Sequence, residues 1–538
     1  MGSLKHVIAY RGWVASLVVL SMSFPTGSSF AAEEIRIEGG TIEAVAARES
    51  GVRVFKGIPY AAPPVGELRW RPPRQVAPWE GTRQVGEWGP RCMQSSRLGD
   101  IDPLNKRMGE DCLYLNVWTP ARAASERLPV MVWIHGGSNN VGAASQPDYD
   151  GTNLAKKGVV VVTVNYRLDV FGFLAHPELT KESGTASSGN YGLLDQIAAL
   201  QWVQKNIAAF GGNPDLVTVF GESAGAFDIS LLMTSPLAKG LFARVIGQSG
   251  GALTPVPAVG PKPLRIGEEE GSKFGQALGA SSIAELRAKS AQDVLQAAVA
   301  APISYGFGVV DGYVVPEHPA RLFAQGKQHD VPLLVGWNQD EGTLFAERLA
   351  KWGPGLPSYA ERVQAQFKND ADAVLKLYPS GGSLTEDKAA FATLFGDQII
   401  GYGAWAWAER ASSAAKAPTY RYYFTRRPPG APELSLNPLA APGVYHAAEL
   451  YYMWNNLQIR DWPWAAEDRR LADVMASYWV NFAKTGDPNG EGLPQWPAYK
   501  PGGAGQIMEL GKEISPRGEP RRDRYEFFDA YYQRVTSR

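Results

Sequence analysis

Short apolar runs alternate along the chain with segments of helical periodicity, and this alternation limits the fold more than any other feature of the sequence. Between two of the runs, apolar residues recur at helical spacing from Tyr191 to Phe210. The runs themselves have the length and composition of strands buried on both faces, and they span residues 129–134, 159–164, 216–220 and 331–336. This order predicts an α/β fold with a central, mostly parallel sheet and helices on both of its faces.

Two longer stretches rich in Ala, Glu and Lys, at about 264–300 and 359–377, are predicted to form large helical insertions over the sheet. No internal repeat, low-complexity tract or linker divides the 538 residues, so we expect one large domain. The 45% apolar content is sufficient for a large core. A net charge of −1 and the lack of any basic run argue against nucleic acid as a partner.

The first 31 residues have the layout of a secretory signal peptide. Lys5 and Arg11 precede an apolar stretch at 13–24, and small side chains at Ser29 and Ala31 predict cleavage after Ala31. This stretch is shorter than the roughly 20 residues that a helix needs to span a bilayer. We therefore expect residues 32–538 to be the mature domain, periplasmic or secreted, with no stable membrane anchor after cleavage.

Cys92 and Cys112 are the two cysteines of the chain. In an exported protein, a pair so close in sequence predicts a disulfide, and closing such a loop stabilises the fold by roughly 3 kcal/mol on the chain-entropy model. Two cysteines cannot form a zinc site alone, and no other ligand spacing typical of a metal site is present. We therefore expect no metal.

The segment Gly221-Glu222-Ser223-Ala224-Gly225 fits the Gly-x-Ser-x-Gly pattern in an informative context. A predicted strand precedes it and a helix-compatible apolar segment follows it, as in a strand-to-helix elbow that exposes a nucleophilic serine at the positive end of a helix. Ser249 matches the same pattern, but glycines and Pro255 follow it, and no helix can start there in register. The context favours Ser223 as nucleophile and a structural role for Ser249.

A serine nucleophile needs a positioned base, which an acid holds in place. In α/β-hydrolases the chain order is serine, acid, histidine, which leaves His318, His329 and His446 as candidates for the base. His446 lies in a loop punctuated by Gly and Pro, whereas the other two are expected to be solvated surface histidines. The run at 331–336 leads to two neighbouring acids, and the residues alone do not decide between Asp340 and Glu341.

The run at 129–134 leads into His-Gly-Gly-Ser-Asn-Asn at 135–140, where small residues let the backbone approach a substrate. Backbone N–H groups of such a turn can stabilise an oxyanion. The N–H of Ala224, directly after the nucleophile, supplies a complementary donor.

Taken together, these segments resemble the type-B carboxylesterase and cholinesterase family over nearly all of the mature chain. The family implies an α/β-hydrolase fold and a serine esterase that needs no cofactor. The motifs that carry the resemblance are FKGIPY at 55–60, LRW at 68–70, EDCLYLN at 110–116, NYR at 165–167, NYGLLDQ at 190–196, FGGNP at 210–214, FGESAG at 220–225 and DEG at 340–342.

The resemblance also implies a role for individual residues. The triad would be Ser223, Glu341 and His446, and Cys92 would pair with Cys112. The remaining implied roles are oxyanion donors at Gly137, Ser138 and Ala224, and groups close to the triad at Glu222 and Ser249.

Two departures from the family bear on the substrate. Where the family has a third glycine and then an aromatic residue in the oxyanion turn, this chain has Ser138 and Asn139. We expect Asn139 and Asn140 to make the nearby wall polar and to contact a substrate. The loop between the cysteines contains no tryptophan, although cholinesterases place their choline-stacking ring there, so a cholinesterase is not expected.

The sequence therefore predicts an exported serine esterase that acts on a small-molecule ester through an acyl-enzyme. An amidase or a lactonase would use the same triad. An esterase for bulky polycarboxylate esters such as fumonisins, or a catalytically silent binding module, is a further alternative. The sequence yields no prediction of the oligomeric state.

Overall fold

The structure is a computed structural model, and it describes residues 33–44, 51–95, 102, 104–255, 260–301, 306–345, 351–353, 355–430, 443–502 and 505–536. The predicted signal peptide, residues 1–31, lies outside the described residues.

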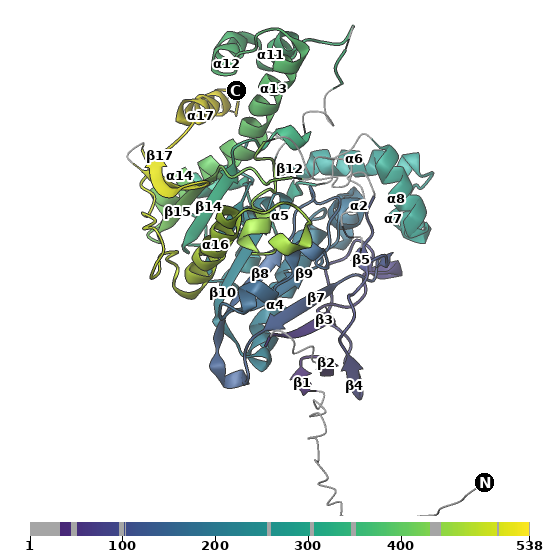
Figure 1. The fold of residues 1–538 in the computed structure, drawn as a ribbon. Helices are drawn as coiled ribbons and strands as arrows, with labels where there is room; N and C mark the ends of the chain where they lie inside the picture. The colour runs from purple at the N-terminus through teal and green to yellow at the C-terminus, as the bar shows by residue number, and fades with distance from the viewer. Residues whose placement is uncertain are drawn as a thin grey trace, which may run out of the picture.

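A ten-stranded sheet forms the centre of the molecule (Figure 1). Every pair from β16 to β9 is parallel, whereas β17, β7 and β3 pair antiparallel at the edges. The mostly parallel sheet predicted from the sequence is confirmed. From edge to edge the strands are β17 (Ile514–Gly518), β16 (Gln506–Leu510), β15 (Thr419–Phe424), β14 (Leu333–Asn338), β11 (Arg244–Gln248), β10 (Gly212–Glu222), β8 (Leu128–Ile134), β9 (Val160–Val164), β7 (Tyr114–Thr119) and β3 (Arg53–Pro59).

Successive side chains of the central strands enter two different apolar cores, as the period of a strand requires. In β8, Val130, Val132 and Ile134 pack in the first core. Met131 and Trp133, which alternate with them, pack in the second. Both faces of the sheet are therefore buried, which explains why these strands are apolar throughout.

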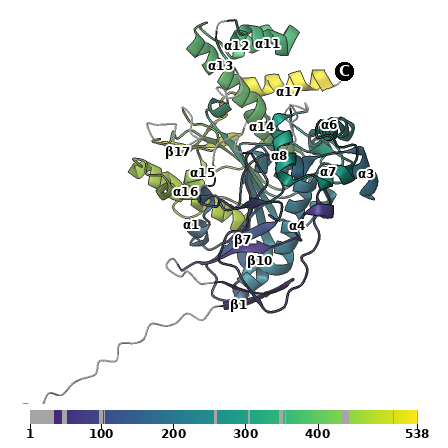
Figure 2. The ribbon, with the colours of Figure 1, turned by 90° about the vertical axis from the view of Figure 1, so that its right-hand side faces the viewer.

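Helices from distant parts of the chain cover the two cores. Residues of α4 (Tyr191–Asn206) and α5 (Ala224–Leu232) lie in the first core, and residues of α16 (Ala466–Thr485) lie in the second. Figure 2 shows α16, with α1 (Thr152–Ala155) and α15 (Leu450–Met453), on one side of the sheet and α4 on the other. The helix predicted from Tyr191 is confirmed, and a short 3-10 turn extends it to Phe210.

The two predicted helical insertions are also present. The stretch 264–300 folds into α6 to α8, and 359–377 contains α11 and α12. Together with α13 and the C-terminal α17, α11 and α12 form a group above the sheet in Figure 1. The remaining helices are α2 (Asp169–Phe173), α3 (Pro177–Glu182), α6 (Leu264–Ala277), α7 (Ile283–Ala288), α8 (Ala291–Ala300), α9 (Pro319–Ala324), α11 (Tyr359–Phe367), α12 (Ala371–Leu377), α13 (Leu384–Gly396), α14 (Tyr402–Ala414) and α17 (Arg522–Thr536).

Three small sheets complete the described structure. None of the described helices combines the length and the apolar character that crossing a membrane requires. The first small sheet contains β1 (Glu33–Ile37), β2 (Gly40–Ala44) and β4 (Thr82–Gln84), and the two others pair β5 (Arg91–Cys92) with β6 (Met108–Gly109) and β12 (Lys262–Pro263) with β13 (Val309–Val310).

The parallel strands bring the predicted site residues to one edge of the sheet. The turn at 135–140 follows β8, Ser223 follows β10, and Glu341 lies shortly after β14. Because the carboxyl ends of parallel strands meet at the same edge, this is where an open α/β sheet forms its ligand crevice.

Candidate active site

Ser223 occupies a sharp turn between β10 and α5. Its backbone has φ 54° and ψ −124°, a conformation that costs a residue other than glycine on the order of 1–3 kcal/mol. The turn is tight because its glycines approach the neighbouring strand: a Cβ on Gly225 would lie 2.0 Å from the carbonyl oxygen of Ile134, and one on Gly221 would lie 2.6 Å from it. The predicted elbow therefore has the strained, close-packed geometry of an exposed nucleophile.

His446 and Glu341 meet in the buried space beside this turn. Nδ1 of His446 lies 2.6 Å from Oε2 of Glu341, whose other oxygen accepts the backbone N–H of Asn338 at 2.7 Å. Asp340 is turned away and accepts the backbone N–H of Val444 at 2.8 Å. Glu341, and not Asp340, therefore contacts the imidazole, while Asp340 bonds the backbone of the loop that carries the histidine.

The other imidazole nitrogen faces Glu222. Nε2 of His446 lies 3.1 Å from Oε1 of Glu222, and no hydrogen bond joins it to Ser223 Oγ in this structure. His446 and Ser223 line the same cavity. In enzymes without substrate, the bond between nucleophile and base is often long and tightens only when substrate binds.

The carboxylates around His446 shift its pKa and their own. Burial lowers the pKa of an imidazole, but the charges of Glu222 and Glu341 outweigh burial and raise the pKa of His446 to about 9. Burial raises the pKa of Glu222 to about 8. The charge of His446 lowers this pKa, and the charges of Glu449 and Glu341 raise it further. Burial also raises the pKa of Glu449. Glu222 and His446 therefore form a coupled pair, in which each group shifts the pKa of the other.

The cavity at this site has a volume of about 60 Å³. Its walls are mainly aliphatic and aromatic, and its described lining includes two carboxylates but neither lysine nor arginine. One of them, Asp148, is paired with Arg460 at 3.2 Å behind the wall. The lining residues are Gly136, Gly137, Ser138, Val141, Gln146, Asp148, Tyr149, Glu222, Ser223, Leu344, Phe345, Tyr445, His446, Ala447, Leu450 and Tyr451.

The turn after β8 presents its backbone to this cavity. Gly137 has φ 109°, and a Cβ there would lie 2.0 Å from the carbonyl oxygen of Val141, so only glycine fits. Ser138 follows with φ 56°. Ala224 begins α5, where a first-turn N–H has no carbonyl partner within the helix. Gly137, Ser138 and Ala224, the predicted oxyanion donors, thus belong to two elements that border Ser223.

The side chain of Asn139 points into the protein and not into this cavity. Asn139 is completely buried and has φ 54°, which turns its side chain into the protein, where the amide donates to Asp228 at 2.8 Å and to the carbonyl of Gly306 at 2.7 Å. Neither asparagine lines the cavity. For Asn139, the expectation of a polar wall is therefore corrected: asparagine tolerates the left-handed backbone here, and its amide serves the fold.

Two further histidines differ from the sequence expectation. His318 and His329 are half-buried rather than solvated, and burial lowers the pKa of both, that of His318 to about 4. His318 caps α9 by accepting the N–H of Ala320, and His329 packs against Phe242. Both have structural environments, and neither lines the cavity beside Ser223.

Ser249 and the cysteines take structural positions. Ser249 follows β11, is buried, and does not line the cavity. Cys92 and Cys112 form the predicted disulfide, with Cα atoms 4.9 Å apart. In the described part of the chain, no group of three or more His, Cys, Asp or Glu side chains is arranged to hold a metal ion.

Sequence reasoning missed several buried polar groups near the site. Glu449 accepts from Asn338 at 2.6 Å and from Gln248 at 3.0 Å, one layer behind Glu341 and His446. Asp228 lies in the middle of α5 and accepts from Asn139 and from Gln196. A single carboxylate within the mainly apolar segment 224–233 is a signal that could have identified Asp228.

Comparison with known proteins agrees with this geometry. The model of the carboxylesterase family matches residues 31–528. Fumonisin B1 esterase of Sphingopyxis macrogoltabida is 39% identical over 495 residues, which cover 89% of this chain and 86% of that protein. Para-nitrobenzyl esterase of Bacillus subtilis is 37% identical over 501 residues, which cover 88% and 94%.

Solved structures give the same result. A structure titled PNB esterase matches with a TM-score of 0.77 at 34% identity, over 92% of this chain and 100% of that chain. A thermophilic PNB esterase matches with a TM-score of 0.79 at the same identity and coverage. This chain therefore belongs to the carboxylesterase family, has the α/β-hydrolase fold and is a carboxylic ester hydrolase.

Proposed function

We propose that the protein is a serine esterase in which Ser223, His446 and Glu341 form the catalytic triad. Ser223 Oγ attacks the ester carbonyl while Nε2 of His446 takes its proton, and Glu341 holds the imidazole through Nδ1. The N–H groups of Gly137, Ser138 and Ala224 stabilise the oxyanion. His446 then protonates the departing alcohol, and water activated by the same imidazole releases the acid from the acyl-enzyme.

One observation carries this proposal. The strained Ser223 turn, the turn at 135–140 and His446 border one cavity, and Glu341 lies 2.6 Å from the far nitrogen of the imidazole. A silent binding module would not need this arrangement, which keeps a serine in an unfavourable backbone conformation beside a histidine and its acid.

Replacing Ser223 tests the mechanism. We expect Ser223→Ala to lose at least about 10⁴-fold in turnover and to lose labelling by an organophosphate, because triad members act as a unit. Ser249→Ala is the matched control and should keep both. Turnover by the Ser223→Ala protein, or a phosphoryl group found on Ser249 by mass spectrometry, would refute the assignment.

The cavity lining supports a substrate whose acyl and alcohol groups are both uncharged. Aliphatic and aromatic side chains dominate the wall, and the described lining holds neither lysine nor arginine that could pair with a carboxylate on the substrate. We expect kcat/KM to be higher for an alkyl ester than for a matched ester with a free carboxylate on the acyl group. An amidase or a lactonase would instead have a higher kcat/KM for a matched amide or lactone than for the ester.

The identity to fumonisin B1 esterase favours a second candidate, an esterase for bulky polycarboxylate esters. The same pair of substrates separates the two candidates. A preference for the carboxylated ester would support the second candidate and would contradict our reading of the cavity wall.

We also propose that the protein is exported, with residues 1–31 removed as a signal peptide. The disulfide between Cys92 and Cys112 supports an oxidising compartment, which is typical of the periplasm and of secreted proteins. Sequencing the N-terminus of the protein from its native host would locate the cleavage site.

A further inference from the structure

A buried amide–carboxylate pair joins the two elements that border the nucleophile. Nδ2 of Asn139, in the turn after β8, donates to Oδ1 of Asp228, in α5, at 2.8 Å. The exposed fractions of the two residues are 0% and 1%. Because neither side chain reaches solvent, the bond is not exchanged for water, and it links the turn directly to the nucleophile helix.

Every polar atom of the Asn139 side chain is used in this way. The second hydrogen of Nδ2 points to the carbonyl of Gly306 at 2.7 Å, and Oδ1 lies 2.8 Å from the hydroxyl of Tyr166. The carbonyl of Gly306 can only accept, so it fixes which end of the amide faces α5. The orientation of Asn139 is therefore determined by its surroundings, and no part of the amide is left for a substrate.

The turn needs stabilising contacts of this kind because its backbone conformation is energetically unfavourable. Ser138 and Asn139 have φ 56° and 54°, two successive residues in the region that favours glycine. A strained turn persists only where its surroundings determine it. Its backbone is also held from the far side, where the carbonyl of Asn139 accepts the N–H of Asp169 at 2.6 Å.

We propose that Asn139 and Asp228 are positioning residues of the oxyanion hole: their bond holds the N–H groups of the turn in register with the N–H of Ala224. The inference rests on the proposed function, since it concerns the donors that act on the oxyanion there. Catalysis needs donors from the turn and from α5 to converge on one oxygen, and small displacements of such donors reduce the rate strongly. The pair acts through the backbone and does not touch the substrate.

The surroundings of Asp228 provide a conservative variant. Burial raises the pKa of Asp228 to about 7, while hydrogen bonds from Gln196 and Asn139 oppose the rise. Oε1 of Gln196 has no partner in the described part of the chain. In Asp228→Asn, the new amide oxygen can keep accepting from Asn139, and its NH₂ can donate to Oε1 of Gln196 after that amide turns over. The hydrogen bond between the side chains of residues 139 and 228 should therefore be kept in this variant.

The experiment compares Asp228→Ala, Asp228→Asn and Asn139→Gly, with glycine chosen at 139 because it accepts the positive φ. Active sites are counted by organophosphate titration, and kcat is expressed per titrated site. For Asp228→Ala and Asn139→Gly we expect kcat to fall about 10- to 100-fold with KM within about threefold, and a trifluoromethyl ketone to bind correspondingly less tightly. Asp228→Asn should stay within about threefold of the original kcat.

The double variant and a matched control complete the test. Because the two residues share one bond, the double variant should lose little more than either single variant. Gln196→Met breaks the other bond of Asp228, so it should lower the melting temperature and leave kcat per site within about threefold. An unchanged kcat in Asp228→Ala and Asn139→Gly, additive losses, or equal losses in Asp228→Asn and Asp228→Ala would overturn the inference. Turnover by Ser223→Ala would instead overturn the proposed function.

Discussion

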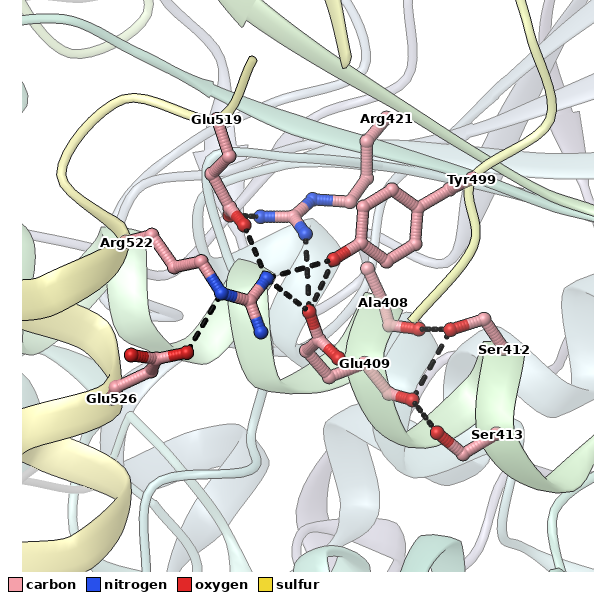
Figure 3. A network of polar contacts seen from close by, with 9 residues as sticks. All are labelled: Ala408, Glu409, Ser412, Ser413, Arg421, Tyr499, Glu519, Arg522 and Glu526. Atoms are coloured by element: carbon pink, nitrogen blue, oxygen red, sulfur yellow. Dashed lines mark hydrogen bonds and ion pairs between the residues drawn. The ribbon is translucent and has the colours of Figure 1, made fainter. Parts of the chain in front are cut away.

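Two regions of the molecule hold clusters of buried or partly buried glutamates, and the two regions differ in the cations that face them. Around His446 lie Glu222, Glu341 and Glu449, and among the described residues none of the three forms an ion pair with lysine or arginine. In the second region, Glu409 and Glu519 face two arginines (Figure 3).

The arginines of the second region carry a permanent charge and fix a structure. Arg421 of β15 is completely buried, pairs with Glu519, and lies over the rings of Trp337 and Tyr499 at 5.1 and 4.4 Å from their centroids. Arg522 lies 2.9 Å from Glu519 and joins the start of α17 to this cluster. Because guanidinium stays protonated at any ordinary pH, the cations of this region keep their charge.

In the part of the chain that the structure describes, the histidine region has no such fixed cation. Its single cation is an imidazole that gains and loses its proton, so the charge state of the whole cluster depends on pH. Glutamate therefore stabilises the fold in one region, and we propose that it tunes a proton acceptor in the other. The following substitutions test this contrast.

We expect the largest effect from Glu341→Gln. Glu341 accepts from two donors, the N–H of Asn338 and the imidazole Nδ1–H, and glutamine has only one acceptor oxygen. If that oxygen stays with Asn338, the NH₂ group faces Nδ1 and forces the tautomer in which Nε2 cannot accept the serine proton. Turnover should fall about 10⁴-fold, which steady-state kinetics will measure.

Asp340→Asn is the matched control, because Asp340 bonds the loop backbone and not the imidazole. It should keep its activity within about tenfold, since an asparagine oxygen can still accept the N–H of Val444. Similar losses in the two variants would contradict the choice of Glu341.

The second effect is on stability and concerns the arginine region. Arg421→Met removes the buried cation and leaves Glu519 and Glu409 with Arg522 alone. Breaking a buried ion pair in this way typically costs about 3 to 5 kcal/mol of unfolding free energy, which urea denaturation will measure. Activity per titrated site should be unchanged.

Arg517→Met provides the control for this change. Arg517 pairs with Glu509 at 2.7 Å, but its side chain is 41% exposed. Exposed pairs contribute at most about 1 kcal/mol. An equal loss of stability in both arginine variants would mean that burial of Arg421 does not decide its contribution.

The fold was largely predictable because buried parallel strands carry a strong apolar signal, and the errors occur where polar residues enter strands. The run predicted at 331–336 is observed as Leu333–Asn338. Pro332 has no N–H to donate, so the ladder begins after it. Asn338 continues the strand although it is polar, because its amide is buried against Glu449.

The site was predictable only in part, for a similar reason. Ser223 could be found because its elbow is a local pattern of strand, glycines and helix. Asp340 and Glu341 are neighbours of like chemistry, so the residues could not separate them, and only the family resemblance selected Glu341. The direction of the Asn139 side chain depends on the φ angles of the turn, which composition and spacing do not encode.

The smallest effect that we predict is a shift in pH dependence from Glu222→Gln. The base must be neutral, so kcat/KM should fall as the pH drops through the pKa of His446 in the free enzyme. Glu222 lies 3.1 Å from Nε2, and its charge raises that pKa, while burial alone would lower it. Glutamine keeps the size of the side chain and removes the charge, so the acid limb should move to lower pH by about one pH unit, as expected for the loss of a nearby opposite charge.

Two variants are the controls for this shift. Glu449→Gln should move the acid limb less, because Glu449 bonds Asn338 and Gln248 rather than the imidazole. Arg421→Met should not move it. An unmoved limb in Glu222→Gln would mean that Glu222 is protonated whenever His446 titrates, and the contrast between the two regions would then rest on Glu341 alone.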